Sequence, residues 1–118
     1  MRVYKLEFAC SPSSLREALR ALDSRELWGP LDSERAIEEG FRVVKLERLE
    51  VGASSVEALV RVSYKAKGRK LWSDLYDFRF TVTADGVVVT VKRVSGLGRT
   101  DPDFIVSEVA RLLAQQGR

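Results

Sequence analysis

Hydrophobic and polar residues alternate near the start of the chain, as they do in a strand with one buried face. Between Arg2 and Phe8, the apolar side chains of Tyr4, Leu6 and Phe8 share one face. Ser11 and Pro12 then supply an N-cap and a first helical position. The apolar residues that follow recur at helical spacing and are Leu15, Ala18, Leu19 and Leu22. This part of the sequence therefore predicts a strand followed by a helix.

Four further strand-like runs follow a short helix predicted over Ser33–Glu39 and ended by Gly40. The first run, 41–51, changes its apolar phase between Leu46 and Leu49, which indicates a β-bulge. The second, 56–66, has one apolar and one charged face. The inner row of the third run is Trp72, Asp74, Tyr76, Phe78, Phe80 and Val82.

A hairpin connects the third and fourth runs, because Asp85-Gly86 suits a two-residue type I′ turn. That turn predicts three cross-strand pairs, namely Val82 with Val89, Phe80 with Val91 and Phe78 with Arg93. After a connection at Gly96-Leu97-Gly98-Arg99, Thr100-Asp101-Pro102 reads as the start of a last helix. Its apolar stripe consists of Ile105, Val106, Val109, Leu112 and Leu113.

These elements predict one α+β domain over residues 1–118, in the order β-α-(α)-β4-α. An antiparallel meander of this kind can close a core by curling around the C-terminal helix. We therefore expect a curved antiparallel sheet that grips the last helix, a topology of the helix-grip or TBP-like kind.

The order of elements resembles the helix-grip fold of the START and Bet v 1 superfamily. The more specific likeness lies in residues 4–51, where an aromatic-rich strand leads through Ser11-Pro12-Ser13-Ser14 to a helix ending in Leu22-Asp23, and a later strand opens at Phe41. The chain departs from that pattern in having four strands after the helices, and it lacks a Pro-Gly step. The resemblance implies a cavity for an apolar or amphipathic molecule, which a shortened meander would make smaller or absent.

Composition narrows the chemistry. The chain has no histidine and one cysteine, Cys10, which excludes histidine-based catalysis and disulfides within one chain. We expect no metal site and no cofactor, and a binding role rather than an enzymatic one. No apolar run approaches the roughly 20 residues of a membrane span, and no signal segment is evident, so a cytoplasmic location is expected. The absence of asparagine is typical of a thermophilic protein.

The aromatic row of the third run is the first candidate site, because aromatic walls with a few polar atoms suit an apolar ligand. The same row also fits a plain core beneath the last helix. Asp74 could orient a ligand hydroxyl, act as an acid, or reach water at the strand's open end; without a partner its pKa would be raised. The predicted ligand-binding residues are Tyr64, Trp72, Asp74, Tyr76, Phe78, Arg93 and Val109.

A basic hairpin is the alternative site. Five cations lie around its turn, with no acid between Glu57 and Asp74; they are Arg61, Lys65, Lys67, Arg69 and Lys70. Such a hairpin could bind the phosphates of a nucleic acid, with Tyr64 or Trp72 stacking on a base, or it could bind another protein. It also fits an edge hairpin that cationic side chains keep from aggregating. The net charge of +3 and the pI near 9.2 are too small to decide between these interpretations.

Overall fold

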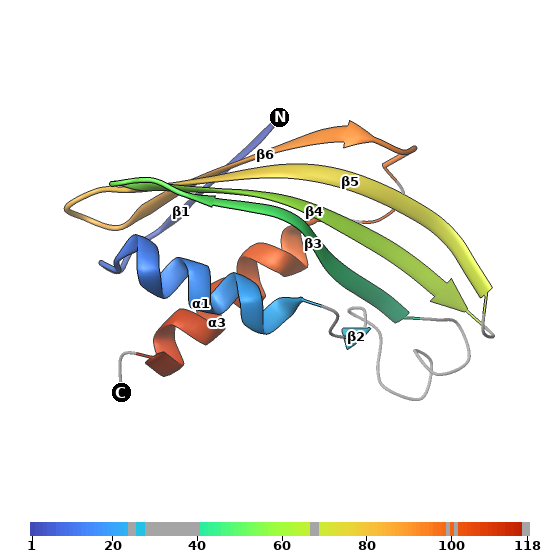
Figure 1. Ribbon diagram of the computed structural model, residues 1–118, viewed down its shortest axis with the longest axis horizontal. Helices are drawn as coiled ribbons and strands as arrows, with labels where there is room; N and C mark the ends of the chain where they lie inside the picture. The colour runs from blue at the N-terminus through green and yellow to red at the C-terminus, as the bar shows by residue number, and fades with distance from the viewer. Residues whose placement is uncertain (24–25, 28–40, 67–68, 99, 101, 117–118) are drawn as a thin grey trace.

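A computed structural model describes residues 1–23, 26–27, 41–66, 69–98, 100 and 102–116 of this chain. Within them, a curved antiparallel sheet lies over two helices, as Figure 1 shows. The strand order is β1-β6-β5-β4-β3-β2. The elements are β1 (Arg2–Leu6), α1 (Pro12–Leu22), β2 (Glu26–Leu27), β3 (Phe41–Val51), β4 (Ser55–Ala66), β5 (Arg69–Val82), β6 (Val87–Ser95) and α3 (Asp103–Gln116).

Two local predictions are confirmed. Ser11 caps α1, since its Oγ accepts a hydrogen bond from the Ser14 amide at 3.1 Å, and Pro12 occupies the first turn. The pairing of β3 with β4 shifts register between Leu46 and Arg48, where the change of apolar phase indicated a bulge. The helix predicted over Ser33–Glu39 lies outside the described residues, and the two-residue strand β2, which pairs with β3, was not foreseen.

The predicted register of the β5–β6 hairpin is wrong by two residues. Val82 pairs with Val87, and Arg93 lies opposite Tyr76 rather than Phe78. The Thr83 amide donates to the Gly86 carbonyl at 2.8 Å, which places Ala84 and Asp85 at the tip of the turn. Gly86 instead lies where a Cβ would come within 2.0 Å of the Leu6 carbonyl oxygen of β1. Close approach to β1, and not the turn itself, therefore explains this glycine.

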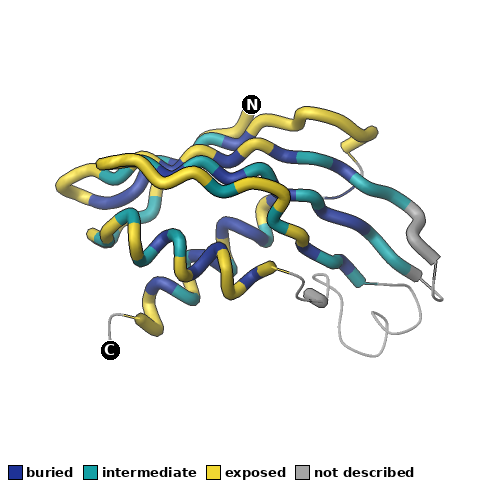
Figure 2. The backbone as a smooth tube through the Cα atoms, viewed as in Figure 1, coloured by how far each residue is buried: buried dark blue, intermediate teal, exposed yellow. Residues whose placement is uncertain are grey.

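The hydrophobic core lies between the concave face of the sheet and the two helices. Figure 2 shows the buried positions gathered on the facing sides of these two layers. Phe78 and Phe80 are fully buried and stack with ring centroids 6.1 Å apart. Val109 of α3 and Leu15 of α1 are fully buried in the same cluster. The shift of the hairpin register by two keeps every side chain on its predicted face, so the inner row of β5 still faces inward.

The α+β class, the antiparallel sheet and the C-terminal helix are confirmed. Sheet and helices form two layers, and α1 and α3 cover the same face of the sheet (Figure 1). The convex face of the sheet carries charged side chains, among them Arg79 and Glu57, whose side chains pair at 2.7 Å. Among the described residues, helices therefore cover only the concave face of the sheet, and the convex face is left uncovered (Figure 1).

Candidate functional site

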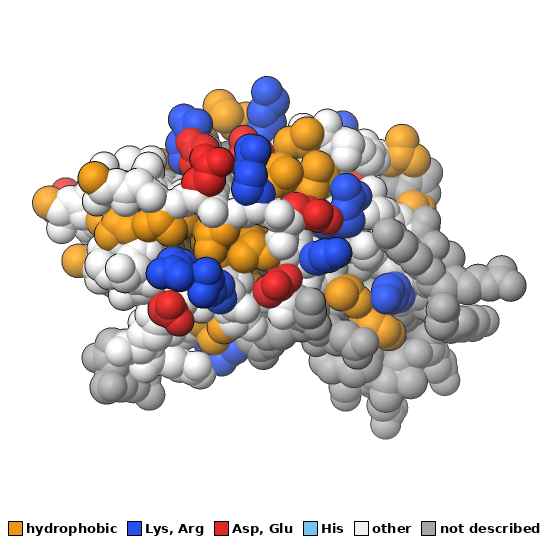
Figure 3. Space-filling model, viewed as in Figure 1, with side chains coloured by type: hydrophobic (Ala, Val, Ile, Leu, Met, Phe, Trp, Pro, Cys, Tyr) orange, Lys and Arg blue, Asp and Glu red, His pale blue; other side chains and the backbone are white. Residues whose placement is uncertain are grey.

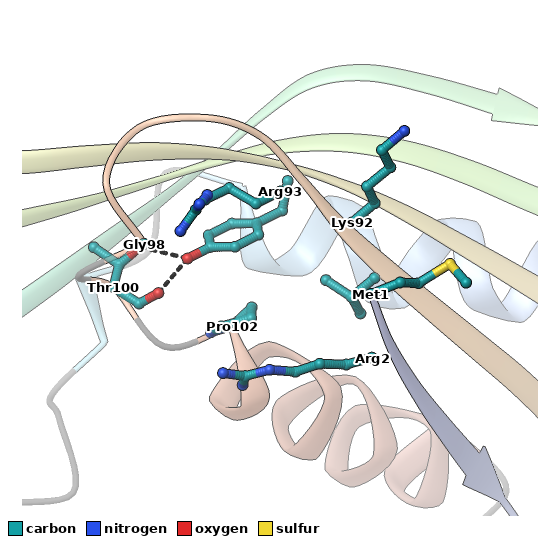
Figure 4. Close-up of a pocket in the computed structure, with 9 residues that line it drawn as sticks. Met1, Arg2, Lys92, Arg93, Gly98, Thr100 and Pro102 are labelled. Carbon is teal, nitrogen blue, oxygen red and sulfur yellow. Dashed lines mark hydrogen bonds between the residues drawn. The ribbon is translucent and has the colours of Figure 1, made fainter.

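A groove of about 440 Å3 opens where the sheet meets the start of α3 (Figure 4). We call it the β1–β6 groove. Its lining comes from the first residues of the chain, from β5, from the end of β6, and from the connection to α3. These residues are Met1, Arg2, Tyr76, Val91, Lys92, Arg93, Gly98, Thr100 and Pro102.

Asp74 lies behind this groove and holds its wall in place. The residue is 1% exposed. One carboxylate oxygen accepts a hydrogen bond from the Gly98 amide at 2.8 Å. The other accepts from the Thr100 amide at 2.9 Å and from the Thr100 hydroxyl at 2.5 Å. Asp74 therefore anchors the β6–α3 connection, residues 96–100, through Gly98 and Thr100.

The hydrogen bonds also decide the ionisation of Asp74. Burial acts to raise the pKa of this carboxyl, but the Thr100 hydroxyl, the Gly98 and Thr100 amides and the charge of Arg93 together outweigh burial. The pKa of Asp74 consequently lies below that of an ordinary aspartate. The expectation of a raised pKa is wrong, because it assumed a buried charge without partners.

Two glycines allow the connection to approach Asp74 this closely. Gly96 has a φ of +97°, and a Cβ there would lie 2.0 Å from Asp74 Oδ1. Gly98 has a φ of +74°, and a Cβ there would lie 1.9 Å from a guanidinium nitrogen of Arg93. Both the left-handed backbone and the lack of space favour glycine at these positions.

Tyr76 forms part of the groove and fastens the same connection. Its hydroxyl donates a hydrogen bond to the Thr100 carbonyl and lies 3.1 Å from the Thr100 hydroxyl oxygen (Figure 4). Burial, with the neighbouring Asp74 charge, raises the pKa of Tyr76 despite the opposing effects of Thr100 and of Arg93 and Arg2. The phenol is therefore neutral at physiological pH and can act as a hydrogen-bond donor.

A second carboxylate fastens the start of α3 to β1. Asp103, in the first turn of α3, accepts a hydrogen bond from Arg2 at 2.7 Å and another from the Tyr4 hydroxyl. The start of α3 is thus joined to β5 through Asp74 and Thr100, and to β1 through Asp103. The walls of the groove therefore come from separate segments of the chain, and these contacts hold the segments together.

Three basic residues line the groove, but they are not equivalent. The guanidinium of Arg93 lies near Gly98, and Arg2 extends along the opposite side below Pro102 (Figure 4). Arg93 lies opposite Tyr76 in the pairing of β5 with β6. Lys92 alternates with Arg93 along β6, and its side chain points away from Arg93 (Figure 4). Arg93 forms no hydrogen bond or ion pair with any residue in the described ranges. Its charge helps to lower the pKa of Asp74, and it opposes the effect of burial that raises the pKa of Tyr76.

The structure separates the residues that were predicted to form one ligand site. Tyr76 and Arg93 line the groove, and Asp74 supports it from behind. Phe78 and Val109 are fully buried in the core. Tyr64 and Trp72 face each other across β4 and β5, with ring centroids 5.2 Å apart and planes tilted by 44°, and neither lines the groove.

The basic hairpin is only partly described. Arg61 lies on the convex face, where its guanidinium contacts Glu47 at 3.1 Å and the Ser73 hydroxyl at 3.0 Å. Lys65 is half-buried on β4. Lys67 lies outside the described residues, and Arg69 and Lys70 are placed only as residues of β5. Arg61 is therefore engaged within the protein rather than held ready for a phosphate.

Sequence reasoning missed the contribution of Arg2, Thr100 and Pro102 to the groove. Thr100 and Pro102 were interpreted as a helix start, and Arg2 as the first residue of a strand. Nothing local in the sequence indicates that these segments meet. The one available signal was the pair of glycines ahead of Thr100, which is typical of a backbone that must approach another group closely.

Two kinds of feature are absent from the described residues. No helix among them is long and apolar enough to cross a membrane. No group of acidic, cysteine or histidine side chains within the same residues could hold a metal ion. Cys10 is half-buried against the core, and burial raises the pKa of its thiol, which disfavours the reactive thiolate.

No protein-family model, no curated protein and no solved structure matches this chain.

Proposed function

We propose that this chain is a small-ligand binding module that holds an amphipathic molecule in the β1–β6 groove. The observation that carries the proposal is the groove itself. Its volume of about 440 Å3 lies within the range of roughly 300 to 1,000 Å3 that is usual for ligand sites. Its lining is more polar than apolar, and it combines the apolar side chains of Val91 and Pro102 with charged and hydroxyl groups that could orient a bound molecule.

The composition of the walls supports an amphipathic ligand. Val91, which is 3% exposed, and the buried Pro102 provide apolar surface. The ring of Tyr76 adds an aromatic wall, on which an apolar group can pack. Arg93 and the Thr100 hydroxyl supply the polar part of the lining. A molecule with an apolar body and one polar end can therefore satisfy both parts of the groove.

The anchoring of the groove also supports a binding role. Asp74 receives three hydrogen bonds from the β6–α3 connection, and Asp103 ties α3 to β1. Walls that are held before a ligand arrives lose less conformational entropy on binding. The helix-grip arrangement is likewise part of the proposal, because a curved antiparallel sheet and a C-terminal helix are the elements that such a fold requires.

Nuclear magnetic resonance can test the proposed site directly. We would titrate 15N-labelled protein with octan-1-ol and with octanoate and follow the amide shifts. The proposal expects saturable shifts concentrated at Tyr76, Val91, Gly98 and Thr100. Amides of the convex face, such as those of Glu57 and Arg79, serve as internal controls. Saturable binding with shifts confined elsewhere in the chain, or no saturable binding to either compound, would exclude the groove as the ligand site.

A further inference from the structure

The unused hydrogen-bonding capacity of Arg93 indicates which class of ligand the groove prefers. A guanidinium carries five N–H donors and no acceptor. Arg93 donates to no acceptor in the described part of the chain. Asp74, the nearby carboxylate, already receives hydrogen bonds from Gly98 and Thr100. The Arg93 donors therefore border the groove without a protein acceptor, and a planar two-oxygen group is the partner that matches their geometry.

The charge around the groove distinguishes a single from a double negative charge on the ligand. Arg93 lies close enough to Asp74 to lower its pKa, and Arg2 pairs with Asp103 at 2.7 Å. Lys92 also lines the groove, so three cationic side chains, those of Arg2, Lys92 and Arg93, lie around it with the two carboxylates of Asp74 and Asp103. A bound monoanion would balance these charges, whereas a dianion such as a phosphate monoester would leave one uncompensated negative charge. The charge balance therefore favours the monoanion.

The position of Arg93 also fits an anionic group at one end of a ligand. Its guanidinium lies near Gly98, on the same side of the groove as Thr100 (Figure 4). Val91 belongs to the inner row of β6, two residues before Arg93. A ligand with its charged group at Arg93 can therefore extend its apolar part along Val91 and the side of Pro102.

We propose that the β1–β6 groove selects amphipathic carboxylic acids, with Arg93 binding the carboxylate and Val91 and Pro102 packing against the apolar part. This inference rests on the proposed function, to which it adds the ligand's chemical class and the residue that recognises it. Lys92 also lines the groove, but its side chain points away from Arg93, so it is not the residue assigned to the carboxylate (Figure 4).

Three ligands with the same alkyl chain test the headgroup. Isothermal titration calorimetry would compare octanoate, octan-1-ol and octyl phosphate with the wild-type protein at neutral pH. A hydrogen-bonded charge pair contributes enough for octanoate to bind about tenfold or more tightly than octan-1-ol. Equal affinities for the acid and the alcohol would overturn the carboxylate assignment, and so would tighter binding of octyl phosphate. Absence of saturable binding by all three compounds would overturn the proposed function itself.

Variants of Arg93 test the recognising residue. Arg93→Gln should remove most of the preference for octanoate over octan-1-ol, while the affinity for octan-1-ol changes by less than about threefold. Arg93→Lys keeps the charge but not the planar donor pair, and should retain part of the preference. Lys45→Gln is the matched control, since it removes an exposed positive charge on β3 that does not line the groove. Unchanged acid preference in folded Arg93→Gln, or an equal loss in Lys45→Gln, would refute the role of Arg93.

The folded state of each variant is verified by its amide spectrum. If Arg93→Gln does not fold, Arg93→Lys decides the question alone, through its ratio of octanoate to octan-1-ol affinity. A ratio equal to that of the wild type would then contradict recognition by the guanidinium fork.

Discussion

Asp74 is a charged residue that the structure places within a hydrophobic surrounding, and its partners account for its presence there. It lies on the inner row of β5 between Trp72 and Tyr76, two aromatic residues. Three hydrogen bonds from Gly98 and Thr100 replace the water that burial removes. A carboxylate with such partners contributes to stability, whereas removal of its acceptor oxygen leaves buried donors unsatisfied.

Replacement of this carboxylate should therefore weaken the fold. We expect Asp74→Asn to lower the free energy of unfolding by about 1 to 3 kcal/mol. An amide has one acceptor oxygen, whereas both carboxylate oxygens of Asp74 accept hydrogen bonds. Urea denaturation followed by circular dichroism would measure the change. Asp77→Asn, on the exposed face of the same strand, is the control and should change stability by less than about 0.5 kcal/mol. Equal free energies of unfolding for Asp74→Asn and the wild type would show that the three hydrogen bonds do not stabilise the fold.

The lowered pKa of Asp74 predicts how stability depends on pH. A carboxyl whose pKa is lower in the folded than in the unfolded state stabilises the fold above the unfolded value of about 3.9. That contribution is lost as the pH falls through the folded pKa. The stability difference between wild type and Asp74→Asn should thus be constant from about pH 5 to 7 and shrink below about pH 4. A difference that grows on acidification would contradict the direction of the shift.

At the scale of elements, the β6–α3 connection determines where α3 begins. Its backbone turns at Gly96 and Gly98, both with left-handed φ, and reaches Thr100, which Asp74 and Tyr76 hold. Asp103 then adds the contact with β1. The last helix is thereby fixed at its first turn as well as by its buried stripe, and the groove lies beside this attachment.

Substitution of Gly96 tests this attachment. Gly96→Ala would bring a Cβ within 2.0 Å of Asp74 Oδ1 at a φ of +97°, so we expect a loss of about 1 to 3 kcal/mol in unfolding free energy. Gly52→Ala is the matched control. Its Cβ would meet the Ser55 side-chain oxygen at 3.1 Å, a contact that a rotation of Ser55 can relieve. Thermal unfolding of both variants should separate them by several degrees, and comparable melting temperatures would argue against the close packing of this connection.

At the scale of the whole molecule, charges of both signs are intermixed on the surface. Figure 3 shows basic and acidic side chains interspersed on the face that it presents. On the convex sheet face, Arg79 pairs with Glu57 and Arg61 with Glu47. Among the described residues, the positive charges are therefore not concentrated in one patch (Figure 3), although the chain has a net charge of +3. Such a surface attracts a polyanion weakly.

This distribution predicts weak binding of nucleic acids. We expect fluorescence anisotropy with a single-stranded oligonucleotide to give a Kd no tighter than about 1 μM at physiological salt, in the range of non-specific binding. Any binding at low salt should weaken steeply as salt is added. Tighter binding that Lys65→Gln abolishes, with Lys92→Gln as control, would instead favour the basic hairpin as the functional surface.

Local patterns in the sequence determined the elements and their buried faces. Side chains in a strand alternate with period two, so the row containing Trp72, Phe78 and Phe80 follows from β5 alone. The Ser11 cap and the bulge after Leu46 were likewise predictable, because each depends on a few neighbouring residues. The register of the β5–β6 hairpin was not, since the placement of Gly86 depends on its contact with Leu6 of β1.

Only the tertiary structure decided which residues share a site. Arg2, Tyr76, Arg93 and Thr100 meet in one groove although they come from both ends of the chain, and Phe78 and Val109 lie in the core instead. The partners of Asp74 are 24 and 26 residues away in the sequence. Period-two alternation shows which face a side chain takes, but depth of burial and hydrogen-bond partners depend on how distant segments pack against that face.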